Sequence, residues 1–139
     1  MNDKYDVIFK ILSDPIRRKP EAVKLARKID EEKAYTAISA ITYHEYLLGV
    51  YLSHWRNKQK LKEMLRKAEA ELKIFDILPY TEAIARKTAE KLAYLIKIGK
   101  PTSLADLIIA ATAITHKLKL VTRNKKHYEN IPELEIITY

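Results

Sequence analysis

Two acidic side chains stand at the starts of predicted helices, and they are the first candidates for chemistry in this sequence. Glu45 lies within Ile41 to Tyr46, and Asp106 directly precedes Leu107 to Ala111, the most apolar helical segment of the chain. A carboxylate at the mouth of a buried helix is costly unless a cation compensates its charge. Carboxylates from separate elements can together hold a hard divalent ion such as Mg²⁺ or Mn²⁺. The pair therefore predicts a metal site.

Helix capping is the competing interpretation of both acids. Thr42 precedes Glu45 by three residues, and Ser103 precedes Asp106 by three, which is the spacing of a capping box. In a capping box the carboxylate binds backbone N–H groups of its own helix and needs no catalytic role. Aspartate is scarce, at six residues, and Asp106 adjoins the most apolar helix, which favours chemistry there. From the residues alone, both interpretations stay open.

Composition narrows the kind of chemistry. The chain has 139 residues and a net charge of +8, from 26 Lys plus Arg against 18 Asp plus Glu. Such an excess favours an anionic partner, most commonly nucleic acid. The absence of cysteine excludes disulfides, thiolate metal sites and thiol nucleophiles, and two glycines are too few for a phosphate-binding loop. Without a signal peptide or an apolar stretch of about 20 residues, we expect a soluble, cytoplasmic protein with no membrane partner.

Helices and short strands alternate along the chain. The patterns predict helices over 19–32, 39–52, 57–73, 81–99 and 103–117, strands over 34–38, 74–78, 118–122 and 134–138, and a polar turn over 123–126. Short strands separated by helices need crossover connections, which predicts a mostly parallel sheet covered on both faces. Ligand sites in such sheets lie at the carboxyl ends of the strands. We therefore expect the Glu45 and Asp106 carboxylates to approach each other at that edge, because both are placed after separate strands.

Three segments, in order, resemble motifs of the PIN-domain ribonucleases of the VapC toxin type. Ile38 to Val50 resembles the second motif, Gly99 to Ala113 the third, and Leu120 to Tyr128 the fourth. The resemblance covers roughly residues 20 to 139. It implies an α/β, PIN-like three-layer fold, with a mostly parallel central sheet and helices on both faces. Residues 1–139 would form a single domain.

The resemblance also implies an activity and a set of site residues. Relatives of this type are metal-dependent endoribonucleases that hydrolyse RNA phosphodiester bonds with Mg²⁺ or Mn²⁺, usually as homodimers held inactive by a VapB-type antitoxin. The implied metal ligands and catalytic acids are Asp6, Glu45 and Asp106, the fourth catalytic position is Asn124, and the implied substrate-binding residues are Thr122, Arg123 and Lys125.

The amino end departs from the family pattern. Relatives open with an apolar strand leading to Asp-Thr-Asn-Val, whereas here Val7 to Leu12 follows Lys4-Tyr5-Asp6. We predict Asp6 as the first ligand, then Asp3, and then Asp14 if Val7 to Leu12 is itself the first strand. Because of this departure, one alternative function stays open: a degenerate, non-catalytic PIN-like protein that binds RNA or an antitoxin. A PIN nuclease of RNA maturation is the other.

A stripe of large apolar residues predicts self-association. Its members lie on one predicted helix and are Leu47, Leu48, Tyr51, Leu52 and Trp55. One small domain needs less apolar and aromatic surface than this stripe provides. We therefore expect a homodimer.

Overall fold

The computed structural model describes residues 7–9, 31 and 35–138, which contain a parallel β-sheet. The strands are β1 (Val7–Phe9), β2 (Thr36–Ser39), β3 (Asp76–Leu78), β4 (Lys119–Val121) and β5 (Ile136–Ile137). Their order in the sheet is β3-β2-β1-β4-β5. Every pair of neighbouring strands is parallel, which confirms the predicted sheet.

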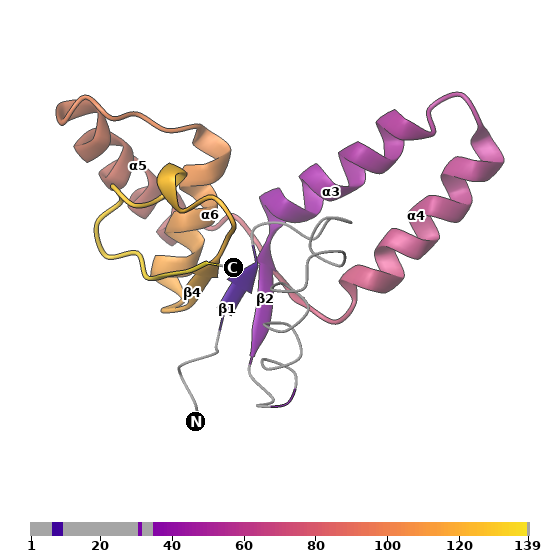
Figure 1. Ribbon diagram of the computed structural model, residues 1–139, viewed down its shortest axis with the longest axis horizontal. Helices are drawn as coiled ribbons and strands as arrows, with labels where there is room; N and C mark the ends of the chain where they lie inside the picture. Colours follow the sequence, from indigo (N-terminus) through magenta and orange to yellow (C-terminus); the bar gives the residue numbers. More distant parts are fainter. Residues whose placement is uncertain (1–6, 10–30, 32–34, 139) are drawn as a thin grey trace.

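Four α-helices and one short 3₁₀ helix complete the described part of the chain. They are α3 (Ala40–Ser53), α4 (Lys58–Leu72), α5 (Glu82–Lys97), α6 (Leu104–Thr115) and the 3₁₀ helix η2 (Lys125–His127). In Figure 1, α5 and α6 pack together on one side of the strands, while α3 and α4 form a hairpin that extends away on the other. No helix in this part of the chain combines the length and apolar character needed to cross a membrane.

Alternate side chains of the strands face two different helical layers. Ala37 and Leu120 belong to the cluster that contains Leu95 of α5 and buried residues of α6. Their neighbours Ile38 and Val121 instead pack with Leu72 of α4 and with partly buried side chains of α3. Successive residues of a strand point to opposite faces of the sheet, so helices cover both faces. The predicted three-layer α/β arrangement is confirmed.

Helix α6 is the most buried helix among the described residues. Leu107 to Ala113 are seven consecutive residues that are all buried, as expected for a helix that is apolar on most sides. The helix ends where Lys117 adopts a left-handed φ of 57° and the Leu118 N–H donates to the Ala113 carbonyl at 2.9 Å. This turn leads after a few residues into β4.

Glycine ends α5, as the sequence predicts. Gly99 has a φ of 73°, a conformation that costs glycine little because it has no Cβ. The N–H of Lys100 then donates to the Leu95 carbonyl at 2.9 Å and satisfies the end of the helix. The chain is thereby redirected toward the start of α6.

Some predicted boundaries differ from the structure. Strand β3 begins at Asp76 rather than at Ile74, because the Phe75 N–H donates to the Leu72 carbonyl and extends the last turn of α4. The predicted polar turn over 123–126 is replaced from Lys125 by η2. The helix predicted over 19–32 lies outside the described residues apart from position 31, and the first strand is described only over 7–9.

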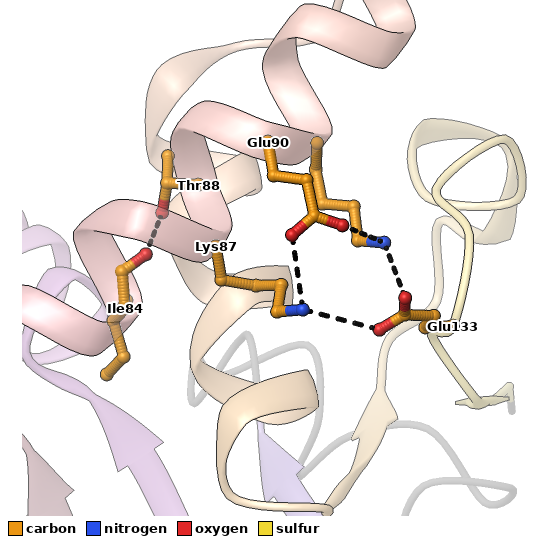
Figure 2. Close-up of polar contacts among 6 residues, drawn as sticks. Ile84, Lys87, Thr88, Glu90 and Glu133 are labelled. Atoms are coloured by element: carbon orange, nitrogen blue, oxygen red, sulfur yellow. Dashed lines mark hydrogen bonds and ion pairs between the residues drawn. The ribbon is translucent and has the colours of Figure 1, made fainter.

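Four charged side chains connect α5 to the loop before β5. Lys91 Nζ lies 3.1 Å from Glu133 Oε1 and 3.4 Å from Glu90 Oε1. Lys87 makes the equivalent contacts with the other oxygen of each glutamate, at 3.6 Å and 3.3 Å. Figure 2 shows Glu133 facing Lys87 and Glu90 across the gap between α5 and the loop. The Lys91 side chain is only 4% exposed, and these glutamates supply the opposite charge that a buried ammonium group needs.

Glu133→Gln is expected to destabilise the fold at neutral pH more than Glu135→Gln, whose carboxylate lies 4.0 Å from Lys119 at the surface. Lys91 and Lys87 lower the pKa of Glu133 below its ordinary 4.5, so its stabilising charge is present at neutral pH. Urea unfolding as a function of pH measures the effect. The gap between wild type and Glu133→Gln should close as the pH falls below 4.5, and a gap that persists in acid would contradict this account.

Candidate active site

Asp106 reaches the carboxyl edge of the sheet by a different route from the one predicted. It does not follow a strand; it lies in the first turn of α6, after the loop that leaves α5. Only a few residues separate the end of α6 from the start of β4, so α6 runs antiparallel to the strands. Its amino end therefore lies at the carboxyl edge of the sheet. Asp106 is therefore at the expected edge, but in the first turn of a helix and not, as predicted, after a strand.

Two separate hydrogen bonds hold the backbone and the side chain of Asp106. Ser103 is the N-cap of α6, and its Oγ accepts the Asp106 N–H at 3.1 Å. The carboxylate Oδ1 instead accepts a hydrogen bond from the Tyr128 hydroxyl at 2.9 Å. The capping motif thus explains the Asp106 amide, whereas the carboxylate also reaches to the segment after β4. The Asp106 side chain remains 13% exposed.

Tyr128 is a buried hydrogen-bond donor at the centre of this site. Its side chain is 0% exposed and belongs to the main core cluster. Burial raises the pKa of the Tyr128 hydroxyl far above its ordinary range, and the charges of Asp106 and Glu45 raise it further. Tyr128 therefore stays protonated and donates to Asp106. On the other carboxylate oxygen, Oδ2, His127 Nδ1 lies at 3.5 Å.

The capping interpretation of Glu45 is wrong. Ser39, not Thr42, is the N-cap of α3, and its Oγ accepts the Ile41 N–H at 3.1 Å. Glu45 is therefore six residues beyond the cap instead of three, too far for a capping box. It is an exposed side chain near the start of a helix that leaves the carboxyl end of β2.

Glu45 and Asp106 line two different cavities. The Glu45 charge reaches Tyr128, and Ile41 packs α3 against α6. Asp106 lines a cavity of about 360 Å³, while Glu45 lines one of about 470 Å³ between α3 and α4. Across 7–9, 31 and 35–138, no three His, Asp or Glu side chains are grouped to hold a metal ion. The predicted ligand Asp6 and its alternatives Asp3 and Asp14 lie outside the described residues. Because β1 begins at Val7, the condition under which the sequence favours Asp14 is met.

The loop after β4 carries the other predicted site residues. Thr122 is 1% exposed, and its Oγ1 accepts the Asn124 N–H at 3.1 Å, so in the structure it shapes the loop. Arg123, Asn124 and Lys125 are exposed at its tip. The loop thus presents one amide and two cations beside the segment that holds Tyr128.

Sequence reasoning assigned no role to Tyr128. The residue was part of a recognised motif, but its hydroxyl was not connected to Asp106, 22 residues earlier. The sequence carries no local signal for it, because Tyr128 stands among polar and charged residues over 123–130 and its burial is evident only in the structure. The identity of its hydrogen-bond partner depends on the tertiary fold.

Comparison with known proteins agrees with this geometry. The chain belongs to the PIN-domain family, whose profile matches residues 7–133. It is 33% identical over 107 residues to Ribonuclease VapC of Rickettsia bellii, covering 77% of each chain. It is 35% identical over 117 residues to Toxin FitB of Neisseria gonorrhoeae, covering 82% of this chain and 83% of the relative. The predicted resemblance to VapC-type PIN proteins is confirmed.

Solved structures support the same fold. FitAcB from Neisseria gonorrhoeae superposes with a TM-score of 0.74 at 28% identity, over 94% of this chain and 96% of that one. VapBC-1 from nontypeable Haemophilus influenzae gives a TM-score of 0.78 at 23% identity, over 95% and 98%. At 23% identity, the similarity to VapBC-1 supports the fold alone.

Tyr128→Phe is expected to lower the free energy of unfolding by about 1.5–3 kcal/mol at pH 7, because it removes a hydrogen bond to a charged, largely buried acceptor. Tyr35→Phe is the matched control. Its hydroxyl donates to Asp76 Oδ2 at 2.8 Å, but at an exposed position on the amino edge of the sheet, so a loss below about 1 kcal/mol is expected. Burial, with Asp76, raises the pKa of Tyr35 to about 12, so both hydroxyls are protonated in the measurement. Equal losses in urea unfolding would contradict the special role of Tyr128.

Proposed function

We propose that this protein is a metal-dependent endoribonuclease that hydrolyses RNA phosphodiester bonds, and that it is the toxin of a VapBC-type pair. The observation that carries the proposal is the Asp106 carboxylate at the carboxyl edge of the sheet, held by the hydroxyl of Tyr128. Relatives named as VapC ribonucleases support the reaction class. Complexes named VapBC and FitAcB among the similar structures support the toxin assignment.

The donor atoms suit Mg²⁺ or Mn²⁺. Asp106 and Glu45 supply carboxylate oxygens, the ligands that hard divalent ions prefer. Asp14 is the proposed third acid, because β1 starts at Val7 and is parallel to its neighbours, so the carboxyl edge is reached by the chain that follows β1 and not by Asp6, which precedes it. Tyr128 occupies Oδ1 of Asp106, which fixes the direction of the carboxylate. When bound, the ion neutralises charge on the phosphate and activates water for hydrolysis.

The chain's own residues position the substrate and the water. We assign Arg123 and Lys125, exposed on the loop after β4, to phosphates of the RNA strand. Asn124 between them orients the attacking water through its side-chain amide. The hydrogen bond from the Asn124 N–H to Thr122 Oγ1 holds this loop in shape, which limits the motion of the amide.

Self-association through α3 and the turn after it is a second part of the proposal; Trp55 lies in that turn and not, as predicted, on the helix. Leu48, Leu52 and Trp55 are 47%, 69% and 70% exposed. Large apolar side chains that are exposed together often mark a protein–protein contact. Leu47, which the sequence placed in the same stripe, packs instead against the cluster of Ile38. The proposed dimer surface is therefore narrower than the sequence stripe. A VapB-type antitoxin is the proposed second partner, with the cytoplasm as the compartment.

Asp106→Asn is expected to abolish cleavage of single-stranded RNA in Mn²⁺ while changing the free energy of unfolding by about 1 kcal/mol or less. The amide keeps the shape of the side chain but lacks the charge that holds the metal. Asp76→Asn, at the opposite edge of the sheet, is the matched control and should cleave normally. EDTA should stop wild-type cleavage.

Equal cleavage by wild type and Asp106→Asn would overturn the proposed mechanism. Asp14→Asn tests the remaining ligand in the same assay, and Asp6→Asn, before β1, is its comparison. Loss of activity in Asp106→Asn with full activity in Asp14→Asn would keep the nuclease but show that Asp14 is not the first ligand. A wild type that binds RNA without cleaving it would favour the non-catalytic alternative.

The double change Leu52→Ala and Trp55→Ala is expected to weaken a homodimer roughly tenfold or more, because buried aromatic anchors dominate interface energies. Light scattering at micromolar concentration measures the mass of each variant. Ile74→Ala removes an equally exposed apolar side chain, 74% accessible, from the turn after α4 and should leave the dimer intact. A wild type that is monomeric under these conditions would refute the dimer.

A further inference from the structure

A cavity of about 360 Å³ opens beside Asp106 and contains residues to which none of the roles above is assigned. One wall comes from the loop between α5 and α6, and the other comes from η2 and the residues that follow it. The polar lining residues used below are Lys100, Thr102, Lys126, His127 and Asn130. The cavity therefore extends the candidate active site from Asp106 toward the loop between α5 and α6.

The cavity has a firm apolar floor. Leu95 and Ile131 line it and are 1% and 4% exposed, as members of the core cluster that also holds Tyr128. The Thr102 hydroxyl donates to the His127 carbonyl at 3.5 Å, which connects the two walls. An apolar floor with a few polar groups around it is the usual composition of a site for a small organic group.

The charge of the lining favours an anion. Lys100 and Lys126 are exposed lysines on opposite walls, and Asp106 is the one acid among the residues that line the cavity. His127 also lines the cavity, with its Nδ1 at 3.5 Å from Asp106 Oδ2. Two ammonium groups next to a single carboxylate attract phosphates and repel cationic segments of a protein partner. Nucleic acid is therefore favoured over a basic peptide.

The size of the cavity limits the ligand. Pockets for small molecules range over about 300–1,000 Å³, and this one is at the lower end. It has room for one nucleotide of a single strand, with a base over Leu95 and Ile131 and phosphates at the lysines. Unstacked bases of single-stranded RNA are commonly read by side-chain amides on their edges, and Asn130 supplies one here.

We propose that this cavity binds the nucleotide adjacent to the phosphate that is cleaved. Lys100 and Lys126 hold the flanking phosphates, and Asn130 contacts the edge of the base. This inference rests on the proposed ribonuclease function and deepens it, because it makes the cavity a determinant of which sequence is cut.

The first test measures RNA binding without cleavage. A fluorescein-labelled single-stranded RNA is titrated with protein in EDTA over a series of KCl concentrations, and anisotropy reports the affinity. Lys100→Ala with Lys126→Ala should weaken binding roughly tenfold or more near 0.1 M salt and reduce the salt slope by about 1.4, for two lost phosphate contacts. The matched control changes Lys58 and Lys62, exposed on α4 in the distant hairpin, to alanine (Figure 1).

The second test measures base preference. A pool of RNAs with randomised sequence is cleaved in Mn²⁺, and the cut sites are sequenced. Asn130→Ala should relax the preference at one position next to the cut by about 5- to 100-fold, since a good side-chain contact to a base discriminates to that extent. Gln59→Ala, which removes an exposed amide from α4, should leave the preference unchanged.

The outcomes separate this inference from the function on which it rests. If the wild type neither binds nor cleaves RNA, the proposed function fails, and the inference fails with it. If the wild type cleaves RNA but the lysine pair behaves like its control and Asn130→Ala keeps the base preference, the inference alone is overturned. If the lysine pair loses affinity for an antitoxin protein and keeps its affinity for RNA, the cavity is a protein site, which also overturns the inference.

Discussion

The burial of α6 is the constraint on which the candidate site depends. Seven successive residues of this helix are enclosed by the sheet and the neighbouring helices, so the helix has little freedom to shift or rotate. Its first turn is thereby fixed at the carboxyl edge of the sheet. Asp106 is the residue at which this rigid element meets solvent. Because the helix cannot shift, the Asp106 carboxylate cannot move further into solvent. Other segments must therefore supply the hydrogen-bond donors or positive charges that stabilise it.

Tyr128 is the partner that connects Asp106 to the rest of the core. Its ring packs in the same cluster as α6, and its hydroxyl is directed to Oδ1. The residue follows η2, so the loop of Asn124 and the position of Asp106 are coupled through it. Parallel topology explains why these groups meet, because residues that follow β2 and β4 and precede α6 share one edge. The opposite edge carries the more exposed pair of Tyr35 and Asp76.

Local patterns predicted those features of the fold that depend on neighbouring residues. Gly99 ends α5 and Ser103 caps α6 because backbone groups within a few residues decide both outcomes. Competition between nearby caps was harder to predict: Ser39 and Thr42 are both good cap residues, and the end of β2 selects the first. Leu47 looked exposed because a helix pattern does not reveal which face a distant strand covers. The contact of Tyr128 with Asp106 joins residues that only the tertiary fold brings together, so sequence spacing gave no sign of it.

The positive charges around this site are compatible with a group of acids that would act on RNA, and they account for part of the net charge of +8. Carboxylates that bind a metal repel the phosphates of RNA, by about 1 kcal/mol for each pair of charges at 4 Å in water and by more where water is excluded. Cations beside the acids offset that repulsion without occupying the ligand atoms. Arg123 and Lys125 stand on one loop and Lys100 and Lys126 around the cavity of Asp106, so positive charge flanks the acid from two elements. Under the proposed function, attraction of the RNA strand depends on these cations and therefore on salt, whereas hydrolysis depends on the acids and the metal they would hold. The two can be varied separately in one protein.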